Sequence, residues 1–229
     1  MKSSDLAAVM NAVDARSAVA RIVNMSTGDV RLVRDEGVAD DPLSATLREA
    51  FQTGRSRTVK TPAGELFVDA YLPPLRLVLV GAVHIAQALV PMASSVGYSV
   101  IVIDPRTAFA TVDRFPNVVL DTRWPDKALA DLTLDQQTAF CALTHDPKID
   151  EPGLIAALAS DAFYIGALGS SRTHEKRCER LREQGVAEDR LTRIHAPIGL
   201  NIGAVGAPEI AVSIMAEITQ TLRQREVSG

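Results

Sequence analysis

Cysteine is scarce in this sequence of 229 residues, in which only Cys141 and Cys178 occur. They form no C-x-x-C pair and no disulfide framework, so a reducing cytoplasm is the expected compartment. Long apolar runs are also missing, and the first residues lack the basic-then-apolar pattern of a signal peptide. We therefore expect neither a membrane span nor a secretory signal.

Basic charge is not in excess either, because 24 Lys and Arg side chains stand against 28 Asp and Glu, a formal charge of −4. This balance argues against a general electrostatic surface for nucleic acid. The sequence has no clustered His or Cys at metal-ligand spacing, so no metal site is predicted. It has no G-x-S-x-G elbow, and nothing indicates a serine or cysteine triad. No catalytic residue is assigned.

Apolar residues make up 47% of the sequence, which is typical of a globular protein with a complete hydrophobic core. One stretch organises the rest of the chain. Leu75–Val80 is an unbroken apolar run, typical of a strand buried in a parallel sheet, and Gly81 permits a tight turn after it. His84–Val96 has apolar residues at helical spacing, Tyr98–Ile103 predicts a second strand, and Asp104 ends it. This order is that of a Rossmann-type dinucleotide fingerprint.

The fingerprint is incomplete. Its usual form is G-x-G-x-x-G/A, and here it stands as Gly81–Ala86, with the first glycine present and an accepted alanine at the end. Val83 occupies the second glycine position, where a β-branched side chain should crowd a pyrophosphate. Asp104 has two interpretations, an acceptor for a ribose hydroxyl or an acidic residue in a wet turn. The sequence therefore predicts the fold and weakened NAD binding.

Residues 1–74 predict a small α+β domain that ends at Pro73-Pro74, a stiff break and the expected domain boundary. Residues 75–229 continue as alternating strands and helices, which predicts an α/β Rossmann-like parallel sheet with helices on both faces and strand order 3-2-1-4-5. In the first domain, strands are expected at 17–24, 29–33, 57–59 and 65–71, and a helix at 42–53 that Asp40 or Asp41 caps. In the second, further strands are expected at 117–120, 138–143, 162–165 and 193–195, and helices at 125–132, 150–160 (capped by Asp150), 172–184 and 208–225.

Ligands of such folds bind at the carboxyl ends of the strands, beside the point where the strand order reverses. Three loops should meet there: Gly81–His84, Thr144–Asp146 and Gly166–Ser171. The third is the best candidate for an anion site, because Gly166 and Gly169 free the backbone, Ser170 or Ser171 opens a helix, and Arg172 adds a forked donor. The alternative is a glycine turn with a serine cap and a solvated arginine.

Two histidines follow predicted strand ends. His84 and His145 are predicted to face one cleft, where either could donate to a phosphate, ligate a metal or move a proton. The alternatives are a polar first helical turn for His84 and a strand-end histidine for His145, with Asp146 starting the next turn. His174 shares a helical stripe with Cys178, which predicts core packing, and the charged run 172–182 is expected to be a solvated helix face.

Several segments resemble the XdhC/CoxI family of maturation factors for molybdenum hydroxylases. The matching segments are Gly81–His84, Leu143–Asp146, Tyr164–Ser170, His195–Ala204, and Pro208–Ile214 with Ala216–Ile218. The sequence departs from the family at Val83, where glycine is usual, and at Asn201, where an acidic residue is usual. Typical members also carry a Gly-Gly-Cys-type motif in the amino-terminal domain, whereas no cysteine precedes Cys141 here.

The resemblance implies a cytoplasmic accessory protein that binds molybdenum cofactor, as molybdopterin or a dinucleotide form, and delivers it to an apo-enzyme. The client would be a molybdenum hydroxylase of the xanthine dehydrogenase or carbon monoxide dehydrogenase type. A cysteine desulfurase is a further expected partner, and a homodimer is the expected assembly. The phosphates of the cofactor are expected at the Gly166–Arg172 loop. The alternative is an NAD(P)-dependent oxidoreductase that uses Gly81 and Asp104, which the side chain of Val83 disfavours.

Overall fold

The structure, a computed structural model, describes residues 2–62 and 64–225. The chain divides into two compact units, one made of residues 1–74 together with residues from 223 onward, the other of residues 75–222. Each unit has its own core and is described by itself. Among the described residues, no helix combines the length and the apolarity that crossing a bilayer requires.

The first unit is built on a four-stranded antiparallel sheet of order β2-β1-β4-β3. Leu47 and Phe51 of α2 pack against Val68 of the sheet, so this unit buries a small core of its own. Its elements are α1 (Ser3–Asp14), β1 (Val19–Asn24), β2 (Val30–Arg34), a 3₁₀ turn (Asp35–Gly37), α2 (Ser44–Thr53), β3 (Arg57–Thr61) and β4 (Gly64–Tyr71).

Two features of this unit differ from the sequence-based expectation. Helix α1 was not predicted, because only Val9 and Ala12 of this helix are buried and two small residues make a very narrow apolar stripe. Helix α2 begins at Ser44, and no side chain caps it. Asp41, one of the two expected caps, instead accepts a hydrogen bond from the amide of Leu43 at 2.9 Å.

The second unit is a six-stranded, all-parallel sheet of order β10-β9-β8-β5-β6-β7. This is the predicted order, with a sixth strand added at the end. β5 and β8 are buried along their whole length, as their unbroken apolar sequences predict. The strands are β5 (Arg76–Val80), β6 (Ser99–Ile103), β7 (Val119–Asp121), β8 (Thr138–Ala142), β9 (Tyr164–Ala167) and β10 (Ile194–His195).

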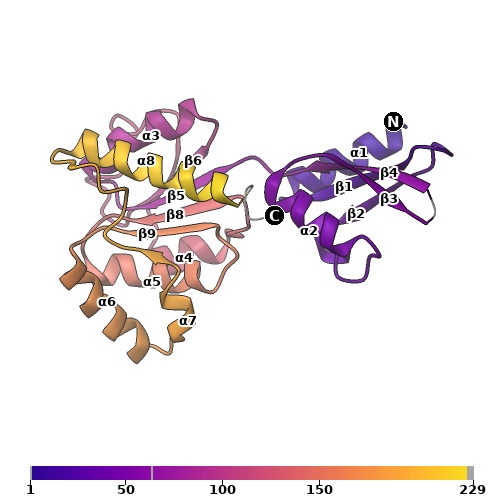
Figure 1. The fold of residues 1–229 in the computed structure, drawn as a ribbon. Coiled ribbons are helices and arrows are strands. Elements are labelled where there is room, and N and C mark those ends of the chain that lie inside the picture. The colour runs from indigo at the N-terminus through magenta and orange to yellow at the C-terminus, as the bar shows by residue number, and fades with distance from the viewer. Residues whose placement is uncertain (1, 63, 226–229) are drawn as a thin grey trace. The chain divides into compact units, whose positions relative to one another are not determined.

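Helices cover both faces of this sheet (Figure 1). One face carries α3 (His84–Ser95) and α8 (Ala207–Gln224), and the other carries α4 (Pro125–Ala130), α5 (Pro147–Leu158), α6 (Ser171–Glu183) and the short α7 (Glu188–Leu191). An apolar stripe of α8 packs on the sheet: Ile214 and Ile218 are fully buried, Leu222 nearly so, and Ile210 half-buried.

Helix α5 begins three residues earlier than expected. Asp146 is its N-cap and accepts a hydrogen bond from the amide of Lys148 at 3.0 Å, and Pro147 takes the first helical position. Asp150, which we expected to cap the helix, therefore lies at the end of its first turn and is free to bond elsewhere.

Candidate functional site

The glycine of the incomplete fingerprint is used for packing between two strand ends. Gly81 has φ +116°, and a Cβ built there would lie 2.6 Å from Cγ2 of Thr144. Thr144 follows β8, the strand next to β5. Gly81 therefore lets two adjacent strand exits meet, and the space beside its Cα is filled by a threonine side chain.

Val83 and His84 stand at the start of α3. Val83 is the N-cap of the helix by backbone geometry, and its side chain packs half-buried against the core. The side chain sits where a dinucleotide fingerprint leaves bare backbone. His84 is the first residue of the helix and is exposed.

Asp104 is not available to a ribose. The residue is fully buried, and its carboxylate accepts hydrogen bonds from the amide of Ala82 at 2.7 Å and from the amide of Arg106 at 2.9 Å. The Arg106 guanidinium adds two more, at 2.9 and 2.8 Å. Burial opposes the charged form, but these bonds outweigh it and hold the pKa of Asp104 below its usual value. The expectation that Asp104 binds a cofactor hydroxyl is corrected: it ties the exit of β6 to the exit of β5.

The loop after β8 is held by Asp150. Its buried carboxylate accepts hydrogen bonds from the hydroxyl and the amide of Thr144, at 2.7 and 3.1 Å, and from the amide of His145 at 3.0 Å. Burial raises the pKa of this carboxyl, against the effect of those bonds. His145 adopts a left-handed backbone with φ +63°, and its side chain is exposed. Asp150 thus fixes the histidine in a conformation that a non-glycine residue seldom adopts.

The loop after β9 has the local geometry expected of a glycine turn that opens a helix, and anion binding there stays a prediction. Ser170 is the N-cap of α6 and accepts a hydrogen bond from the amide of Thr173 at 3.3 Å. Ser171 and Arg172 are exposed in the first turn, and Gly169 has φ +136°, which favours glycine.

Gly166 is a different case from the rest of that loop. It belongs to β9, where it pairs with Cys141 on one side and with His195 on the other. A Cβ at Gly166 would lie 2.5 Å from the side chain of Ile198. Its backbone is therefore committed to the sheet, and its expected place in the anion site is corrected to a packing role.

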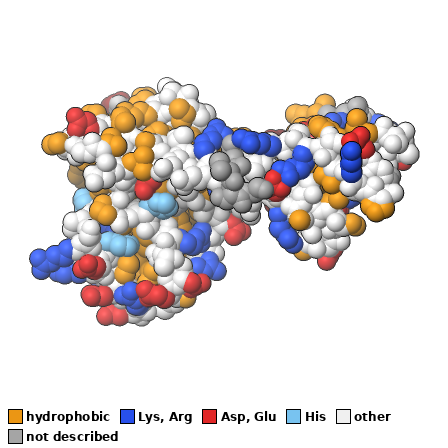
Figure 2. All heavy atoms as spheres, in the orientation of Figure 1, with side chains coloured by type: hydrophobic (Ala, Val, Ile, Leu, Met, Phe, Trp, Pro, Cys, Tyr) orange, Lys and Arg blue, Asp and Glu red, His pale blue; other side chains and the backbone are white. Residues whose placement is uncertain are grey.

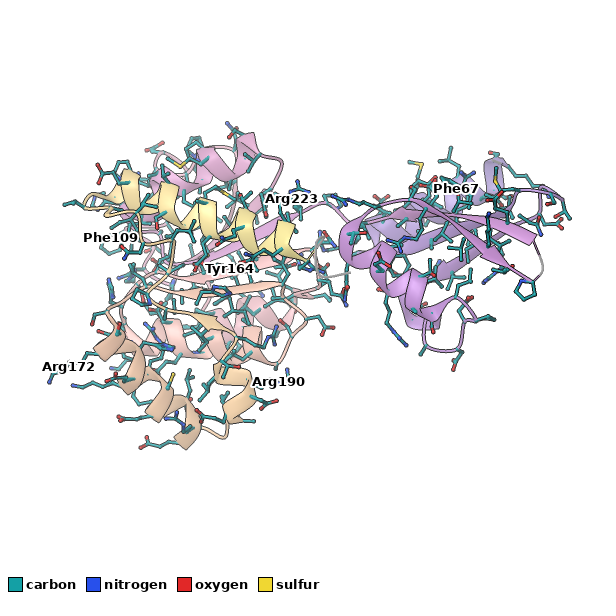
Figure 3. The ribbon with its side chains drawn as sticks, viewed as in Figure 1. Phe67, Phe109, Tyr164, Arg172, Arg190 and Arg223 are labelled. Atoms are coloured by element: carbon teal, nitrogen blue, oxygen red, sulfur yellow. The ribbon has the colours of Figure 1, made fainter. Side chains whose placement is uncertain are left out.

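A pocket of about 250 Å³ opens between the first turns of α5 and α6. It brings together His145 and Arg172 from the predicted site, although His84 is not among the residues that line it within the described chain. Figure 3 shows Arg172 at the start of α6, extending away from the helix axis. The lining residues are His145, Pro147, Asp150, Glu151, Arg172, Thr173, Lys176, Arg177 and Arg180.

Arg177 is the residue of this pocket that the sequence least suggests. The charged run on α6 was expected to be a solvated face, but Arg177 is only 3% exposed. Its Nη2 donates to the carbonyl oxygen of Leu168 at 2.7 Å, whereas its buried Nη1 has no hydrogen-bond partner among the described residues. Burial lowers the pKa of this guanidinium, partly offset by the nearby charges of Asp150 and Glu151. One signal was available: Thr173, Arg177 and Leu181 recur every four residues, as an inward-facing stripe would.

A second polar cluster lies on the α8 face and was also missed. Glu217 accepts hydrogen bonds from the hydroxyl of Tyr164 at 2.5 Å and from the amide of Gly199 at 2.7 Å. Nδ1 of His195 lies 3.2 Å from its other oxygen, and the rings of His195 and Tyr164 are 4.6 Å apart. Figure 3 shows Tyr164 in the sheet under α8. The cluster fixes the segment that follows β10 to the last helix.

The two thiols offer little reactive surface. Cys141 is fully buried in β8, and burial raises the pKa of its thiol strongly. Cys178 is half-buried, with its Sγ 3.5 Å from Nε2 of His174, and burial raises its pKa as well. In the part of the chain that the structure describes, no group of three or more His, Cys, Asp or Glu side chains is placed to hold a metal ion.

We compared the chain with models of known protein families. The family model described as the XdhC Rossmann domain matches residues 77–218. The chain belongs to the XdhC family. The matched residues cover the parallel sheet except Arg76, and they include the Glu217 cluster and the pocket beside α6.

Curated relatives of this XdhC-family chain carry related names. A Bacillus subtilis protein, named as a probable subunit of xanthine dehydrogenase, is 34% identical over 160 residues, which are 69% of this chain and 46% of that protein. The Escherichia coli "Molybdenum cofactor insertion chaperone PaoD" is 34% identical over 163 residues, 71% of this chain and 45% of that protein. The chain thus spans less than half the length of these relatives.

A solved structure extends the likeness to nearly the whole chain. A crystal structure from Bacillus halodurans, described as that of a xanthine dehydrogenase, matches with a TM-score of 0.70 and 26% identity. The match covers 98% of this chain and 68% of that one. The family and the fold expected from the sequence are therefore confirmed.

Proposed function

We propose that this protein is an accessory factor that binds molybdenum cofactor and assists its maturation and insertion into a molybdenum hydroxylase. The client is an apo-enzyme of the xanthine dehydrogenase or carbon monoxide dehydrogenase type. Membership of the XdhC family supports the proposal, and so does the name of the Escherichia coli relative, a molybdenum cofactor insertion chaperone. The protein acts by delivery and carries no assigned catalytic residue.

The observation that carries the proposal is the cationic pocket at the carboxyl ends of the strands. Molybdenum cofactor is a pterin with a phosphate group, and its dinucleotide form has a pyrophosphate. The pocket joins the start of α6, Arg172 and His145, which are donors suited to phosphate oxygens. Its volume of about 250 Å³ is below that of a typical site for a whole cofactor, so it fits the phosphate end.

The buried donor of Arg177 is the test of fit in this structure. A guanidinium nitrogen without a partner calls for an oxygen acceptor, and a phosphate supplies one. By contrast, the places where NAD(P) would bind are already filled. The carboxylate of Asp104 is bonded to Arg106, and the side chain of Thr144 fills the space beside Gly81. The residues present therefore fit a phosphate-bearing pterin better than a nicotinamide dinucleotide laid across β5.

Native mass spectrometry tests the ligand. The purified protein is incubated with molybdenum cofactor or with NAD(P), and the mass of each complex is recorded. We expect a complex with the cofactor, weakened at least tenfold by Arg172→Ala, since a charge-assisted hydrogen bond contributes about 1.5–3 kcal/mol. Arg182→Ala is the matched control, because Arg182 lies on the same helix but pairs with Glu188 at 2.6 Å, outside the pocket. Retention of NAD(P) and not of cofactor would contradict the proposal.

Sulfur for the cofactor is proposed to come from a separate protein, a cysteine desulfurase. Cys141 is buried and Cys178 is half-buried with a raised pKa, so neither is a good thiolate relay. Activation of the apo-hydroxylase is therefore expected to need the desulfurase in addition to this protein, and Cys178→Ser is expected to leave that activation intact. We propose a cytoplasmic homodimer as the working form, to be checked by light scattering of the purified protein and by fractionation of cells.

A further inference from the structure

We infer that the pocket between α5 and α6 is a binding site for a phosphate-type dianion, with the buried guanidinium of Arg177 at its base. This deepens the proposed function, on which it rests only for the identity of the molecule that carries the anion. The anion chemistry itself follows from the side chains that line the pocket.

The first argument is the state of Arg177. A buried charged donor that lacks a partner loses the free energy of its hydration without recovering it. Nη2 of Arg177 donates a hydrogen bond to the carbonyl oxygen of Leu168, and its Nη1 has no partner in the described chain. Arg177 also lines the pocket, so a turn of its side chain would bring Nη1 to a ligand oxygen there and complete its hydrogen bonds.

The second argument is that the neighbouring carboxylates are already engaged. Asp150 accepts from Thr144 and His145. Glu151 accepts from Nε of Arg180 at 2.7 Å and from the side chain of Gln184 at 3.3 Å. Neither acid therefore needs Arg177 as a hydrogen-bond partner, although both lie near enough to affect its charge.

The third argument is the surplus of positive charge. Four cationic side chains, Arg172, Lys176, Arg177 and Arg180, line the pocket with two carboxylates. Within residues 2–62 and 64–225, Arg172 and Lys176 make no ion pair and no side-chain hydrogen bond, so their charges are available to a ligand. Figure 2 shows Lys and Arg side chains gathered where α6 begins. A surplus of two matches the charge of a phosphate monoester or of inorganic phosphate.

The pocket is built from two segments that are far apart in sequence. On one side it is lined by one face of α6, which carries Arg172, Thr173, Lys176, Arg177 and Arg180. Its other wall is the loop that Asp150 holds, with His145 projecting from it. A tetrahedral anion would thus meet donors from α6 and from the loop before α5, and one of them is the buried guanidinium of Arg177, which distinguishes this pocket from a cluster of surface lysines.

Isothermal titration calorimetry tests the inference on the full chain, in a phosphate- and sulfate-free buffer at constant ionic strength. The probes are inorganic phosphate and pyrophosphate. We expect one site per chain for the intact protein and at least a tenfold loss of affinity in the double variant Arg172→Gln/Lys176→Gln. Both side chains are exposed, so the fold should survive their replacement. Arg182→Gln, on the same helix, is the control and should stay within twofold of the parent.

A variant at the base of the pocket completes the design. Arg177→Met should abolish binding of both probes, and circular dichroism reports whether it still folds. If it does not fold, the double variant decides alone. The inference is overturned if the intact protein binds neither probe, or if the double variant binds as the parent does.

The outcome is separable from that of the proposed function. If phosphate binds in the pocket but molybdenum cofactor does not associate in native mass spectrometry, the anion site stands and the chaperone proposal fails. If neither phosphate nor pyrophosphate binds in calorimetry while the cofactor associates equally with the parent and with Arg172→Gln/Lys176→Gln, the chaperone proposal stands and the anion site fails.

Discussion

Replacing Glu217 with glutamine should loosen the segment that follows β10. The carboxylate of Glu217 holds three groups that are far from it in sequence: the Tyr164 hydroxyl, the Gly199 amide and Nδ1 of His195. Glutamine keeps the shape but removes the charge and turns one acceptor into a donor. That donor then faces the hydroxyl and the amide at 2.5 and 2.7 Å, or the histidine at 3.2 Å.

The magnitude follows from the bonds that are lost. Hydrogen bonds to a charged group contribute about 1.5–3 kcal/mol each, and the half-buried side chain is only 15% exposed. The Tyr164 hydroxyl can rotate and accept a hydrogen bond from the new amide, which recovers part of the lost free energy. We therefore expect Glu217→Gln to lower the free energy of unfolding by about 2–4 kcal/mol at pH 7.

The pH dependence has a definite sign. Burial works against ionisation of Glu217, but the bonds from His195, Tyr164 and Gly199 prevail and hold its pKa below the usual value. A carboxyl with a depressed pKa contributes stability above its unfolded pKa of about 4.3 and loses it as the pH falls through the folded value. The difference between parent and variant should therefore be full at pH 7 and shrink below about pH 4.

Urea denaturation followed by tryptophan fluorescence is the assay. Trp124 is the single tryptophan of the chain and lies in the Rossmann unit, so its signal reports on that unit. Glu179→Gln, an exposed position on α6, is the matched control and should change stability by less than about 0.5 kcal/mol. A Glu217→Gln effect at pH 7 no larger than that of the control, or an effect that does not shrink below about pH 4, would refute the reasoning.

Further substitutions test other contacts by the same urea assay. Ile214→Ala should cost about 2–5 kcal/mol because Ile214 is fully buried between α8 and the sheet, and a loss below about 0.5 kcal/mol would contradict that burial. Gly166→Ala should cost about 1–3 kcal/mol, since its new Cβ would lie 2.5 Å from Ile198; an unchanged midpoint would mean that the neighbour moves freely. Asp104→Asn should cost about 1–3 kcal/mol at pH 7 through the lost ion pair with Arg106. Because the pKa of Asp104 is lowered, that cost should begin to shrink below about pH 4, where the unfolded carboxyl titrates, and be lost as the pH falls through the lower folded pKa; a cost independent of pH would argue against the charge.

Much of the second unit was predictable because its signals are local. β5 and β8 are short apolar runs without alternation, which only a strand buried on both faces requires. The strand order then follows from the handedness of parallel crossovers. The cap at Ser170 was also predictable, since a serine before a polar helix is a local signal.

The roles of the acidic residues were not predictable, because they depend on partners distant in sequence. Glu217 meets Tyr164 across 53 positions, and Asp104 meets Ala82 across 22. Asp104 was interpreted from its place in a fingerprint, yet the structure gives it to Arg106, two residues away on the same loop. A motif predicts where a carboxylate lies on the sheet, but it does not predict which group forms hydrogen bonds with that carboxylate.

The clamp that Asp150 forms has a consequence for the energetics of the pocket wall. Thr144 and His145 lie in a loop, but their amides are bonded to a buried carboxylate of α5. These two amides should therefore exchange with solvent deuterium as slowly as those of a strand, since the helix must detach before they open. A ligand arriving at this wall would find it already ordered and would lose little conformational entropy there. Part of the affinity of the pocket is thus set when the chain folds, before any ligand is present.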